Sequence, residues 1–557
     1  MHTDSVSTLD HDDADSFDDS LEVFDFAADV IVVGAGSAGF AAAVTAAKAG
    51  ASVILLERAE YTGGTTALSG GSAWIPNNSS MRAAGLEDQR DDALRFLCRL
   101  AYPQFYDAAH PTLGLAVDQY ELLAAFYDRG PEAIDHLTDI GALDLTADVG
   151  EEAKYGITFT DYGGHLPENR SPVGRHLAPD LNGPTMIERF QGAAEALGVE
   201  IKLGHRVVGV VQNEQGEVAA LEVHTGVRTV IARARKGVIF GSGGFGQNDE
   251  LRRRHLPGRI FGSCAIPTAV GDFVQISEAL GASLANLDRA WWKQVAVEPA
   301  LRHPTPPSLW MPHGDSMIQV DRNGRRVVNE KAPYNERGQI HLAYNPTTRD
   351  HPNAVLFMIW DDAVARNTAF SPFRDPVPLP GKEVDYVIEA ATLAELKARI
   401  DDRLEALRSE TGGLILDGDF VANLELTIDR FNGFAVAGVD DDFGRGGTDF
   451  ERGWALGNRD GLANPTMAPL ADEGPYYCMI VGAGVLDTNG GPRINTSAQV
   501  LDSAGQPIPG LYGAGNCVAT PAGRAYWGPG ATIGLAITFG YIAALNLVEE
   551  PDKPAPE

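Results

Sequence analysis

The feature that most constrains the fold is a glycine-rich turn between an apolar stretch and an alanine-rich one. It lies in residues 28–58, which read ADVIVVGAGSAGFAAAVTAAKAGASVILLER. The turn matches GxGxxG, and Glu57 ends the next apolar stretch, 18 positions after the last glycine. Such glycines permit a tight turn, close approach of a pyrophosphate and close helix–strand packing, and the acid binds a ribose hydroxyl. We therefore predict an α/β unit that binds a dinucleotide through Gly34, Gly36 and Gly39.

Further glycine-rich segments indicate which dinucleotide is bound. RAEYTGGTTALSGG begins directly after Glu57, and KGVIFGSGGFG ends a run of short predicted strands. GLYGAGN recurs at residues 510–516. Glycines let the backbone approach a ligand closely, and contacts from both halves of the chain suit a long cofactor folded into one domain. We expect this cofactor to be FAD rather than NAD.

A Gly-Pro-Gly bend punctuates residues 523–544, GRAYWGPGATIGLAITFGYIAA. The long apolar run behind the bend predicts a buried helix that begins near Ala531. The start of a helix presents free backbone N–H groups and a partial positive charge. We expect it to face a group that is, or becomes, negative. The run is shorter than the roughly 18 consecutive apolar residues of a membrane span, so we interpret it as a core helix and predict no transmembrane segment.

Net charge and cysteine content indicate which partners are excluded and in which cellular compartment the protein is expected. The 557 residues carry a net charge of −32, which argues against nucleic acid and anionic membranes as partners. The four cysteines show no CxxC spacing, so neither a metal site nor a redox dithiol is predicted. Scattered cysteines suit a reducing cytoplasm. Residues 1–26 lack the basic start of a secretory signal and are expected to form a disordered acidic tail.

Six motifs distributed along the chain carry a family resemblance: VVGAGSAG, GGTTALSGGSAWIPNN, GRRVVNEKAPY, NPTMAPL, GLYGAGN and YWGPGATIGLAITFGYIAA. The chain resembles the flavoproteins of the succinate dehydrogenase/fumarate reductase superfamily and, within it, the 3-ketosteroid 1-dehydrogenases. NExxPY and YxGPGATIG are the motifs more specific to the steroid branch. The resemblance implies an α/β, Rossmann-like FAD-binding domain, residues 27–287 plus 479–557, and an inserted α+β catalytic domain, residues 288–478, that caps the flavin.

The same resemblance implies how FAD is held. Succinate dehydrogenases attach FAD to a histidine in the glycine-rich segment, but this chain has no histidine between His11 and His110, so noncovalent binding is expected. The residues expected to contact FAD are Gly34, Gly36, Ser37, Ala38, Gly39, Glu57, Arg58, Gly64, Thr65, Thr66, Gly70, Gly71, Val208, Gly243, Asp272, Gly515, Asn516, Gly530, Thr532 and Ile533.

The resemblance also assigns the chemistry to three tyrosines and one backbone amide. Tyr526 and the N–H of Gly530 match groups that hold the ketone oxygen of the substrate in an oxyanion hole. Tyr334 matches the base that removes the α-proton, while the β-carbon gives hydride to the flavin. Tyr162 falls near a supporting tyrosine, which a base with an ordinary pKa of about 10 requires. The implied reaction is 1,2-desaturation of a 3-ketosteroid, a small hydrophobic ketone, with an external electron acceptor.

Departures from the family pattern leave alternatives open. Trp527 stands where proline is common, and a tryptophan beside Tyr526 is expected to narrow the pocket. A 3-keto-4-(5α)-steroid dehydrogenase or a cyclohexanone-type dehydrogenase would use the same mechanism. A fumarate reductase-like enzyme would need arginines to clamp a dicarboxylate, and the candidates are Arg325, Arg326 and Arg524. A flavin-carrying protein without substrate chemistry is the remaining alternative.

Overall fold

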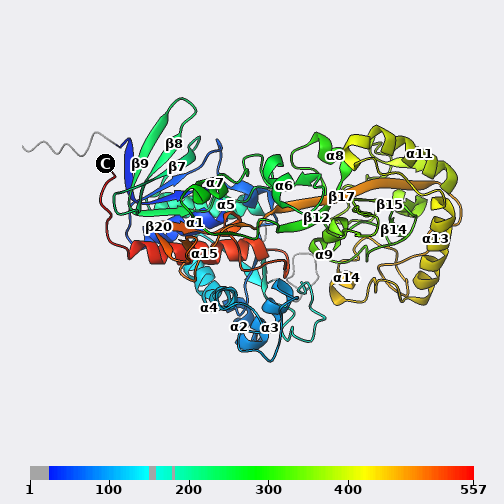
Figure 1. Ribbon diagram of the computed structural model, residues 1–557. Coiled ribbons are helices and arrows are strands. Elements are labelled where there is room, and N and C mark those ends of the chain that lie inside the picture. Colours follow the sequence, from blue (N-terminus) through cyan, green and yellow to red (C-terminus); the bar gives the residue numbers. More distant parts are fainter. Residues whose placement is uncertain (1–23, 148, 150–157, 179–181, 557) are drawn as a thin grey trace, which may run out of the picture.

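The glycine-rich turn follows β1 (Phe26–Val33), a central strand of the larger of two main sheets (Figure 1). The computed structural model describes residues 24–147, 149, 158–178 and 182–556. In the larger sheet the strand order is β19-β20-β9-β1-β2-β6, with β8 and then β7 added to β9. The other strands are β2 (Val53–Leu56), β6 (Glu200–Lys202), β7 (Arg206–Gln212), β8 (Val218–His224), β9 (Thr229–Phe240), β19 (Gln499–Leu501) and β20 (Pro507–Gly513).

The centre of this sheet is parallel, as the continuous apolar strands predict. β1 pairs in parallel with both β2 and β9, and β20 pairs in parallel with β9. The residues from Val30 to Val33 are all buried, because helices cover both faces of a parallel sheet. β1 begins at Phe26, two residues before the apolar stretch at residues 28–33, because Phe26 and its neighbours continue the ladder with β9. The predicted α/β fold is confirmed.

Helix α15 (Ala531–Val548) is the buried helix expected behind the Gly-Pro-Gly bend. It packs between α1 (Ser37–Lys48) and α4 (Val117–Asp139), under the sheet in Figure 1. By length and composition alone α15 is apolar enough to cross a membrane, but 72% of it is buried inside the structure. The same domain contains α2 (Ser79–Ala83), α3 (Arg90–Ala101), α5 (Gly183–Ala196), α6 (Asp249–His255), α7 (Asp272–Ala279), η2 (Gly64–Leu68), η5 (Gly515–Cys517), and the small sheet of β3 (Ala73–Trp74), β4 (Thr146–Ala147) and β5 (His176–Ala178).

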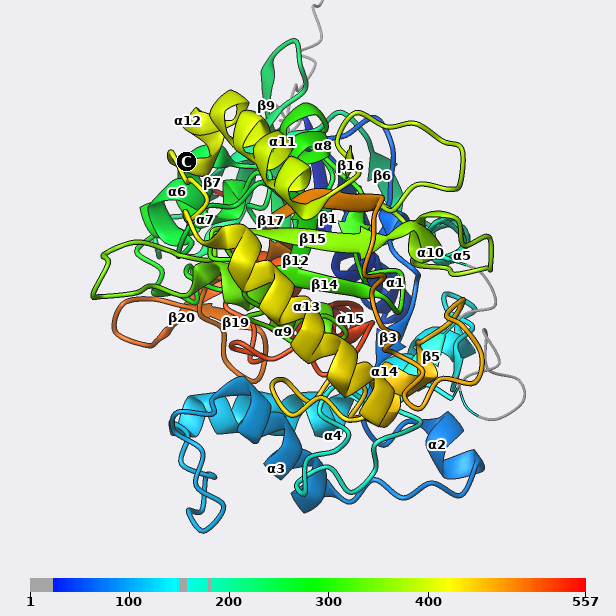
Figure 2. The same cartoon turned by 90° about the vertical axis from the view of Figure 1, so that its right-hand side faces the viewer.

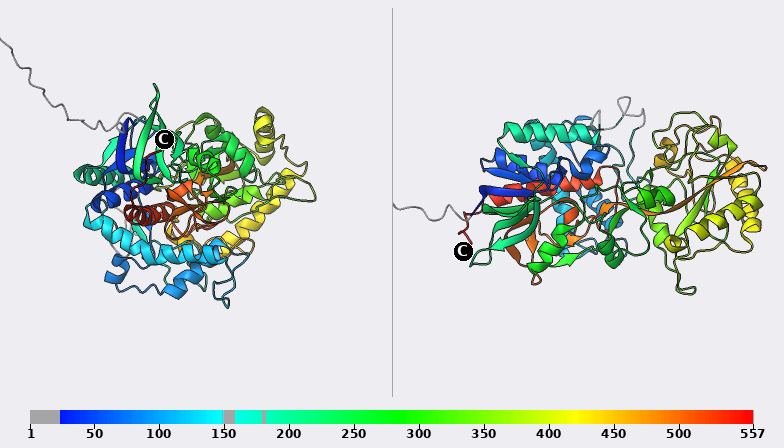
Figure 3. Two further views of the ribbon diagram at one scale, coloured as in Figure 1. Left: turned by 60° about the vertical axis from the view of Figure 1, so that its left-hand side comes forward. Right: turned by 90° about the horizontal axis from the view of Figure 1, so that it is seen from above.

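The second main sheet lies at the other end of the elongated molecule (Figure 3). Its order is β13-β12-β17-β15-β14, and β10 and β16 also pair with β17. Figure 2 shows α11 and α13 in front of this sheet. The elements are β10 (Gly262–Ser263), β12 (Ala290–Ala296), β13 (Ser308–Leu309), β14 (Met317–Val320), β15 (Val355–Asp361), β16 (Ile388–Ala390), β17 (Tyr476–Thr488), α8 (Val297–Arg302), α9 (Tyr334–Gln339), η4 (Ile340–Leu342), α10 (Asp362–Ala365), α11 (Leu393–Ala406), α12 (Arg408–Thr411), α13 (Phe420–Ala437) and α14 (Asp449–Gly453). A separate ribbon joins β11 (Leu284–Ala285) to β18 (Gly491–Pro492).

The structure corrects the expected division at residues 478 and 479. That boundary falls inside β17, which stays in the second sheet as far as Thr488. β10 also belongs to this sheet, although the first segment was expected to run to residue 287 in the other domain. The reason is that β17 is one long apolar strand that extends from the second sheet toward the larger one, where no local sequence signal marks a division (Figure 3).

Candidate active site

One cavity of about 540 Å³ extends from the carboxyl end of β1 to the second sheet. Its walls come from the glycine-rich segments at one end and from Trp310, Tyr334 and Trp454 of the second domain at the other. Ligands of open α/β sheets bind at the carboxyl ends of the strands. The cavity therefore lies where the glycine-rich turn predicts a dinucleotide.

The three glycines of the turn have different roles. Gly34 has a φ of +100°, and a Cβ there would lie 2.6 Å from the carbonyl oxygen of Gly241. Gly36 lines the cavity, and a Cβ on it would meet nothing closer than 3.9 Å. Gly39 does not line the cavity: a Cβ on it would lie 1.7 Å from the carbonyl oxygen of Gly34. Gly39 thus permits close packing of helix and turn, while the other two expose the backbone to the ligand.

Charged residues define the end of the cavity expected to hold the adenosine. The buried Glu57 carboxylate accepts hydrogen bonds from the N–H groups of Ala35 (2.9 Å) and Ala59 (2.8 Å). Each of its oxygens keeps a further lone pair for a ribose hydroxyl. Arg58 forms an ion pair of 3.0 Å with Asp272. Burial raises the pKa of Glu57, so the bound ribose would meet a carboxylate that is costly to leave unpaired.

Val208 lies outside the cavity lining. The residue is 41% exposed, and the preceding residue, Val207, lines the cavity. Successive side chains of a strand point to opposite faces, and the sequence alone left the register of β7 undetermined by one residue.

The other predicted cofactor residues line the same cavity and fit an elongated FAD. The start of α15 enters the cavity through Gly530, Thr532 and Ile533, so its positive end faces the ligand. Near it the buried Asp487 accepts hydrogen bonds from the N–H groups of Gly244 (2.8 Å) and Gly246 (3.1 Å). The predicted residues that line this cavity are Gly34, Gly36, Ser37, Ala38, Glu57, Arg58, Gly64, Thr65, Thr66, Gly70, Gly71, Gly243, Asp272, Gly515, Asn516, Gly530, Thr532 and Ile533.

Three tyrosines meet at the end of the cavity beside the second domain. The ring centroid of Tyr334 lies 5.2 Å from that of Tyr526 and 5.5 Å from that of Tyr162, and the last two are 5.9 Å apart. All three side chains line the cavity and are buried. Tyr334 begins α9, and the N–H of Tyr162 donates to the carbonyl of Trp527 (2.8 Å). The fold thus brings together three tyrosines that lie far apart in the sequence.

The electrostatics of the trio are set by burial. Burial raises the pKa of Tyr334 and of Tyr162 well above the ordinary value, and charge on the neighbouring tyrosines raises both further. Burial also raises the pKa of Tyr526 to about 12, although hydrogen bonds from Tyr334 and from the N–H of Gly530 oppose this rise. At neutral pH all three phenols carry their protons. The Gly530 N–H and the Tyr526 phenol are neighbours, as an oxyanion hole requires.

A buried arginine missed by the sequence analysis stands behind the tyrosines. Arg337 lies one helical turn after Tyr334 and is fully buried. Its guanidinium donates to Oε1 of Gln294 (2.7 Å) and to the carbonyls of Ala332 (2.6 Å) and Trp310 (3.2 Å). Its positive charge lowers the pKa of Tyr162 against the larger effect of burial. No periodicity or motif marks this residue, because its partners lie on β12 and in loops.

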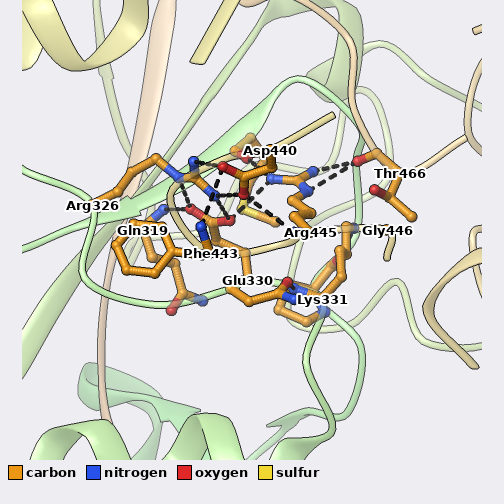
Figure 4. Close-up of polar contacts among 12 residues, drawn as sticks. Gln319, Arg326, Glu330, Lys331, Asp440, Phe443, Arg445, Gly446 and Thr466 are labelled. Atoms are coloured by element: carbon orange, nitrogen blue, oxygen red, sulfur yellow. Dashed lines mark hydrogen bonds and ion pairs between the residues drawn. The ribbon is translucent and has the colours of Figure 1, made fainter. Parts of the chain in front are cut away.

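A network of buried charges fixes the segment that carries Tyr334 (Figure 4). Glu330 accepts two hydrogen bonds of 2.8 Å from Arg326 and one of 3.3 Å from Arg445. Asp440 accepts a further bond of 2.9 Å from Arg326. The ammonium of Lys331 donates to the carbonyl of Gly314 at 2.8 Å. These bonds connect the NEKAPY segment to other parts of the second domain. They therefore fix the position of Tyr334, the last residue of the segment.

Trp527 does not narrow the cavity, contrary to the sequence-based expectation. Its fully buried indole is absent from the cavity lining and stacks on Trp74 (5.5 Å between centroids) and Phe126 (5.7 Å). The rings that do bound the substrate end belong to residues that the sequence analysis did not select: Phe159, Trp310, Phe373, Phe450 and Trp454.

The arginines considered for a dicarboxylate clamp do not reach the cavity. Arg325 and Arg524 are exposed, and Arg326 is paired with Glu330 and Asp440. Among the described residues, the arginines in the lining are Arg58 and Arg206, and both pair with Asp272 at the adenosine end. The substrate end is apolar and aromatic, which favours a neutral ring over a dicarboxylate.

Comparison with known proteins agrees with this geometry. The chain matches the FAD binding domain family model over residues 29–533. It is 30% identical to 4-oxocyclohexanecarboxylate 2-dehydrogenase of Sinomonas cyclohexanicum, over 93% of this chain and 92% of that protein. It is also 30% identical to a 3-oxosteroid 1-dehydrogenase of Mycolicibacterium smegmatis, over 93% and 97%. The solved 3-ketosteroid delta1-dehydrogenase of Sterolibacterium denitrificans shares the fold, with a TM-score of 0.78, 24% identity, and coverage of 94% and 99%.

Fold and site together define an FAD-dependent oxidoreductase that acts on CH–CH groups. The chain belongs to the FAD binding domain family, in the group that includes the 3-oxosteroid 1-dehydrogenases and the oxocyclohexane dehydrogenases.

Proposed function

We propose that this protein introduces a C=C bond next to the carbonyl of a ring ketone, and that 3-ketosteroids, desaturated between carbons 1 and 2, are its substrates. The observation that carries the proposal is the convergence of Tyr334, Tyr162, Tyr526 and the Gly530 N–H at the apolar end of the cavity. These groups supply a base, its support and an oxyanion hole, which removal of a proton next to a ketone requires.

The ketone oxygen would lie between the phenol of Tyr526 and the N–H of Gly530. The N–H of Gly530 lowers the pKa of Tyr526, so the two groups are close enough to share one substrate oxygen. The two donors stabilise the negative charge that develops on this oxygen when the α-proton leaves. Burial of Tyr526 keeps competing water away from its phenol and strengthens its effect.

Tyr334 would take the α-proton from the substrate. Burial and the neighbouring tyrosines oppose formation of its phenolate. The positive charge of Arg337 and a hydrogen bond from Tyr334 lower the pKa of Tyr162, so these two groups favour negative charge within the trio. FAD, when bound, supplies the acceptor for the hydride that leaves the β-carbon. An external acceptor is needed to complete the cycle.

A monocyclic ketone is the second candidate substrate. Identity to the 4-oxocyclohexanecarboxylate dehydrogenase of Sinomonas cyclohexanicum equals that to the steroid enzyme of Mycolicibacterium smegmatis. The rings of Phe159 and Trp454 pack at 5.6 Å and those of Phe373 and Trp454 at 5.2 Å, which gives the substrate end a close aromatic wall. The buried position of Trp527 leaves room that favours the steroid.

We also propose that FAD is bound without a covalent link and that the protein is cytoplasmic. Of the histidines in the lining, His205 lies at the adenosine end next to Glu57, and His176 stacks on Phe159 at the substrate end. Neither lies in the glycine-rich segment after Glu57. The location rests on the unpaired cysteines.

Anaerobic reduction of the bound flavin separates the candidates. We expect a 3-ketosteroid to bleach the flavin absorbance within the mixing time of a manual assay, with cyclohexanone and 4-oxocyclohexanecarboxylate slower and succinate without effect. Bleaching by 4-oxocyclohexanecarboxylate but not by steroids would show that monocyclic ketones, not steroids, are the substrates. The proposed mechanism would still hold. Bleaching by succinate alone would contradict the proposal.

A further inference from the structure

A lysine, a cysteine and a serine form a cluster in the cavity wall that the proposed reaction does not use. Nζ of Lys293, on β12, lies 2.6 Å from Sγ of Cys264 and also contacts Oγ of Ser308, on β13. The Cys264 sulfur lies 3.4 Å from the same serine oxygen. Cys264 is half-buried and lines the cavity, whereas Lys293 is fully buried behind it.

Lys293 lacks the partner that a buried cation normally has. In the described part of the chain it forms no ion pair with a carboxylate, and its contacts are the thiol, the hydroxyl and the ring of Trp310, whose centroid lies 5.8 Å from Nζ. The buried Arg326 and Arg445, by contrast, both pair with Glu330. Lysine is almost never fully buried without a partner, so the thiol and the hydroxyl are the polar groups that stand here in place of a carboxylate.

The distance between nitrogen and sulfur is itself informative. Two heavy atoms bonded to a common third atom lie about 2.5 Å apart, as backbone bond lengths and the N–Cα–C angle show. The 2.6 Å between Nζ of Lys293 and Sγ of Cys264 is close to that spacing. A single oxygen atom bonded to both would fit between them without moving either residue.

We propose that Cys264 and Lys293 are a modification site at which oxidation by hydrogen peroxide forms a covalent S–O–N bridge. The inference rests on the cluster alone and is independent of the proposed function. Peroxide is small enough to enter a cavity that Cys264 lines. Among the described cysteines, Cys264 is the one whose sulfur contacts a lysine amine.

The reaction balances with two molecules of peroxide. The first converts the Cys264 thiol to a sulfenic acid and releases one water. The second removes the sulfenic O–H hydrogen and one amine hydrogen of neutral Lys293 as the O–N bond forms, and releases two waters. Sulfur and nitrogen together lose four electrons, which the two peroxides accept. Two equivalents of dithiothreitol return the thiol, the amine and one water.

The other cysteines provide internal controls. Cys517 is buried and donates to the carbonyls of Phe240 and Ala514, and burial raises its pKa to about 11. Burial likewise raises the pKa of Cys98 to about 12. Neither sulfur contacts a lysine among the described residues. Both should resist peroxide at concentrations that modify Cys264.

Mass spectrometry of the peroxide-treated holoenzyme tests the proposal. After trypsin digestion we expect a linked peptide that contains both residues and exceeds the sum of its parts by one oxygen minus two hydrogens. Cleavage after Lys293 should be lost, because trypsin does not cut at a modified lysine. Dithiothreitol should restore both free peptides. In Lys293→Arg, which keeps a long basic side chain but not the primary amine, Cys264 should proceed to sulfinic acid, and Cys264→Ser should show no change at either position.

The proposal is wrong if wild-type Cys264 becomes sulfinic acid, or stays reduced, while trypsin still cleaves fully after Lys293. A linked peptide that lacks the oxygen would also overturn it, since that mass identifies a direct S–N bond. Because the decisive reading is made on the wild-type protein, poor folding of either variant does not affect it.

Discussion

Tyr334 is the residue on which the proposed chemistry most depends, and its surroundings oppose the task. Burial raises its pKa well above the ordinary value, so its phenolate is scarce at neutral pH. Tyr162, which is distant in the sequence, packs against Tyr334 at 5.5 Å between ring centroids. Arg337, one helical turn after Tyr334, lowers the pKa of Tyr162 and so favours negative charge beside the base.

Replacement of Tyr334 by phenylalanine removes the base and keeps the ring. We expect bound FAD to be retained and flavin reduction by the ketone to slow by about 10²–10⁴, the usual contribution of general-base catalysis. Stopped-flow measurement of flavin absorbance checks this. Tyr512→Phe is the matched control, since that buried tyrosine donates to Glu550 (2.5 Å) outside the cavity lining. A loss of less than tenfold in Tyr334→Phe would assign the base to another residue, with Tyr162 the first candidate.

Arg337 should set the pH at which proton removal becomes efficient. The base acts when deprotonated, so a raised pKa lowers its active fraction at any pH below that pKa, about tenfold for each pKa unit. Arg337→Met should therefore move the rising limb of the rate profile for ketone deuterium exchange to higher pH, whereas Arg337→Lys should restore much of it.

Arg445→Lys is the control for this shift, because Arg445 is equally buried but pairs with Glu330. It should alter stability without moving the profile. If Arg337→Met lowers the rate by the same factor at every pH, the arginine holds Trp310 and Ala332 in place and its charge does not act on the tyrosines.

At the scale of elements, the glycine-rich turn shows what a local pattern can predict. The strand, the turn, α1 and the acidic end of β2 lie as the spacing of Gly34, Gly36, Gly39 and Glu57 implied. α15 begins at Ala531 behind Gly530, whose φ is +90°. These features depend on neighbours in sequence, so the chain reveals them directly.

Contacts between distant segments left no such signal. Lys293 approaches Cys264 and Arg337 approaches Gln294 only because α9 packs on β12 and β10 joins the second sheet. The register of β7 depends on strand pairing in the same way, and this register decides that Val207 rather than Val208 lines the cavity. The family motifs identified the tyrosines but not the charges that surround them.

Gly39→Ala should disrupt the βαβ unit itself. Its Cβ would lie 1.7 Å from the carbonyl oxygen of Gly34, which is backbone and cannot yield without opening the turn. We expect little soluble protein and no retained FAD. Gly192→Ala in α5 is the control, since a Cβ there meets nothing within 4 Å and alanine favours a helix by about 1 kcal/mol. Wild-type FAD content in Gly39→Ala would contradict the close packing described.

At the scale of the whole molecule, the cofactor cavity is lined from β1 to α15, so FAD binding should stabilise the entire fold. Saturation at 100 times Kd adds about 2.7 kcal/mol. FAD removal should lower the midpoint of thermal unfolding, and added FAD should restore it. Glu57→Ala should shrink this shift by removing the ribose contact, whereas Glu214→Ala, in an exposed turn, should not. An equal FAD-dependent shift in both variants would exclude Glu57 from cofactor binding.

The late position of α15 has a consequence for biosynthesis. The glycine turn at Gly34 leaves the ribosome early, but β20, Tyr526 and the helix start at Gly530 emerge only after the whole second sheet has been made. A nascent chain therefore carries an incomplete nucleotide site until then, and the edge of β9 that β20 covers in the folded protein is still unpaired. Capture of FAD marks the moment when the polypeptide has been synthesised through α15, and a ribosome stalled before residue 507 would hold a chain unable to retain the cofactor.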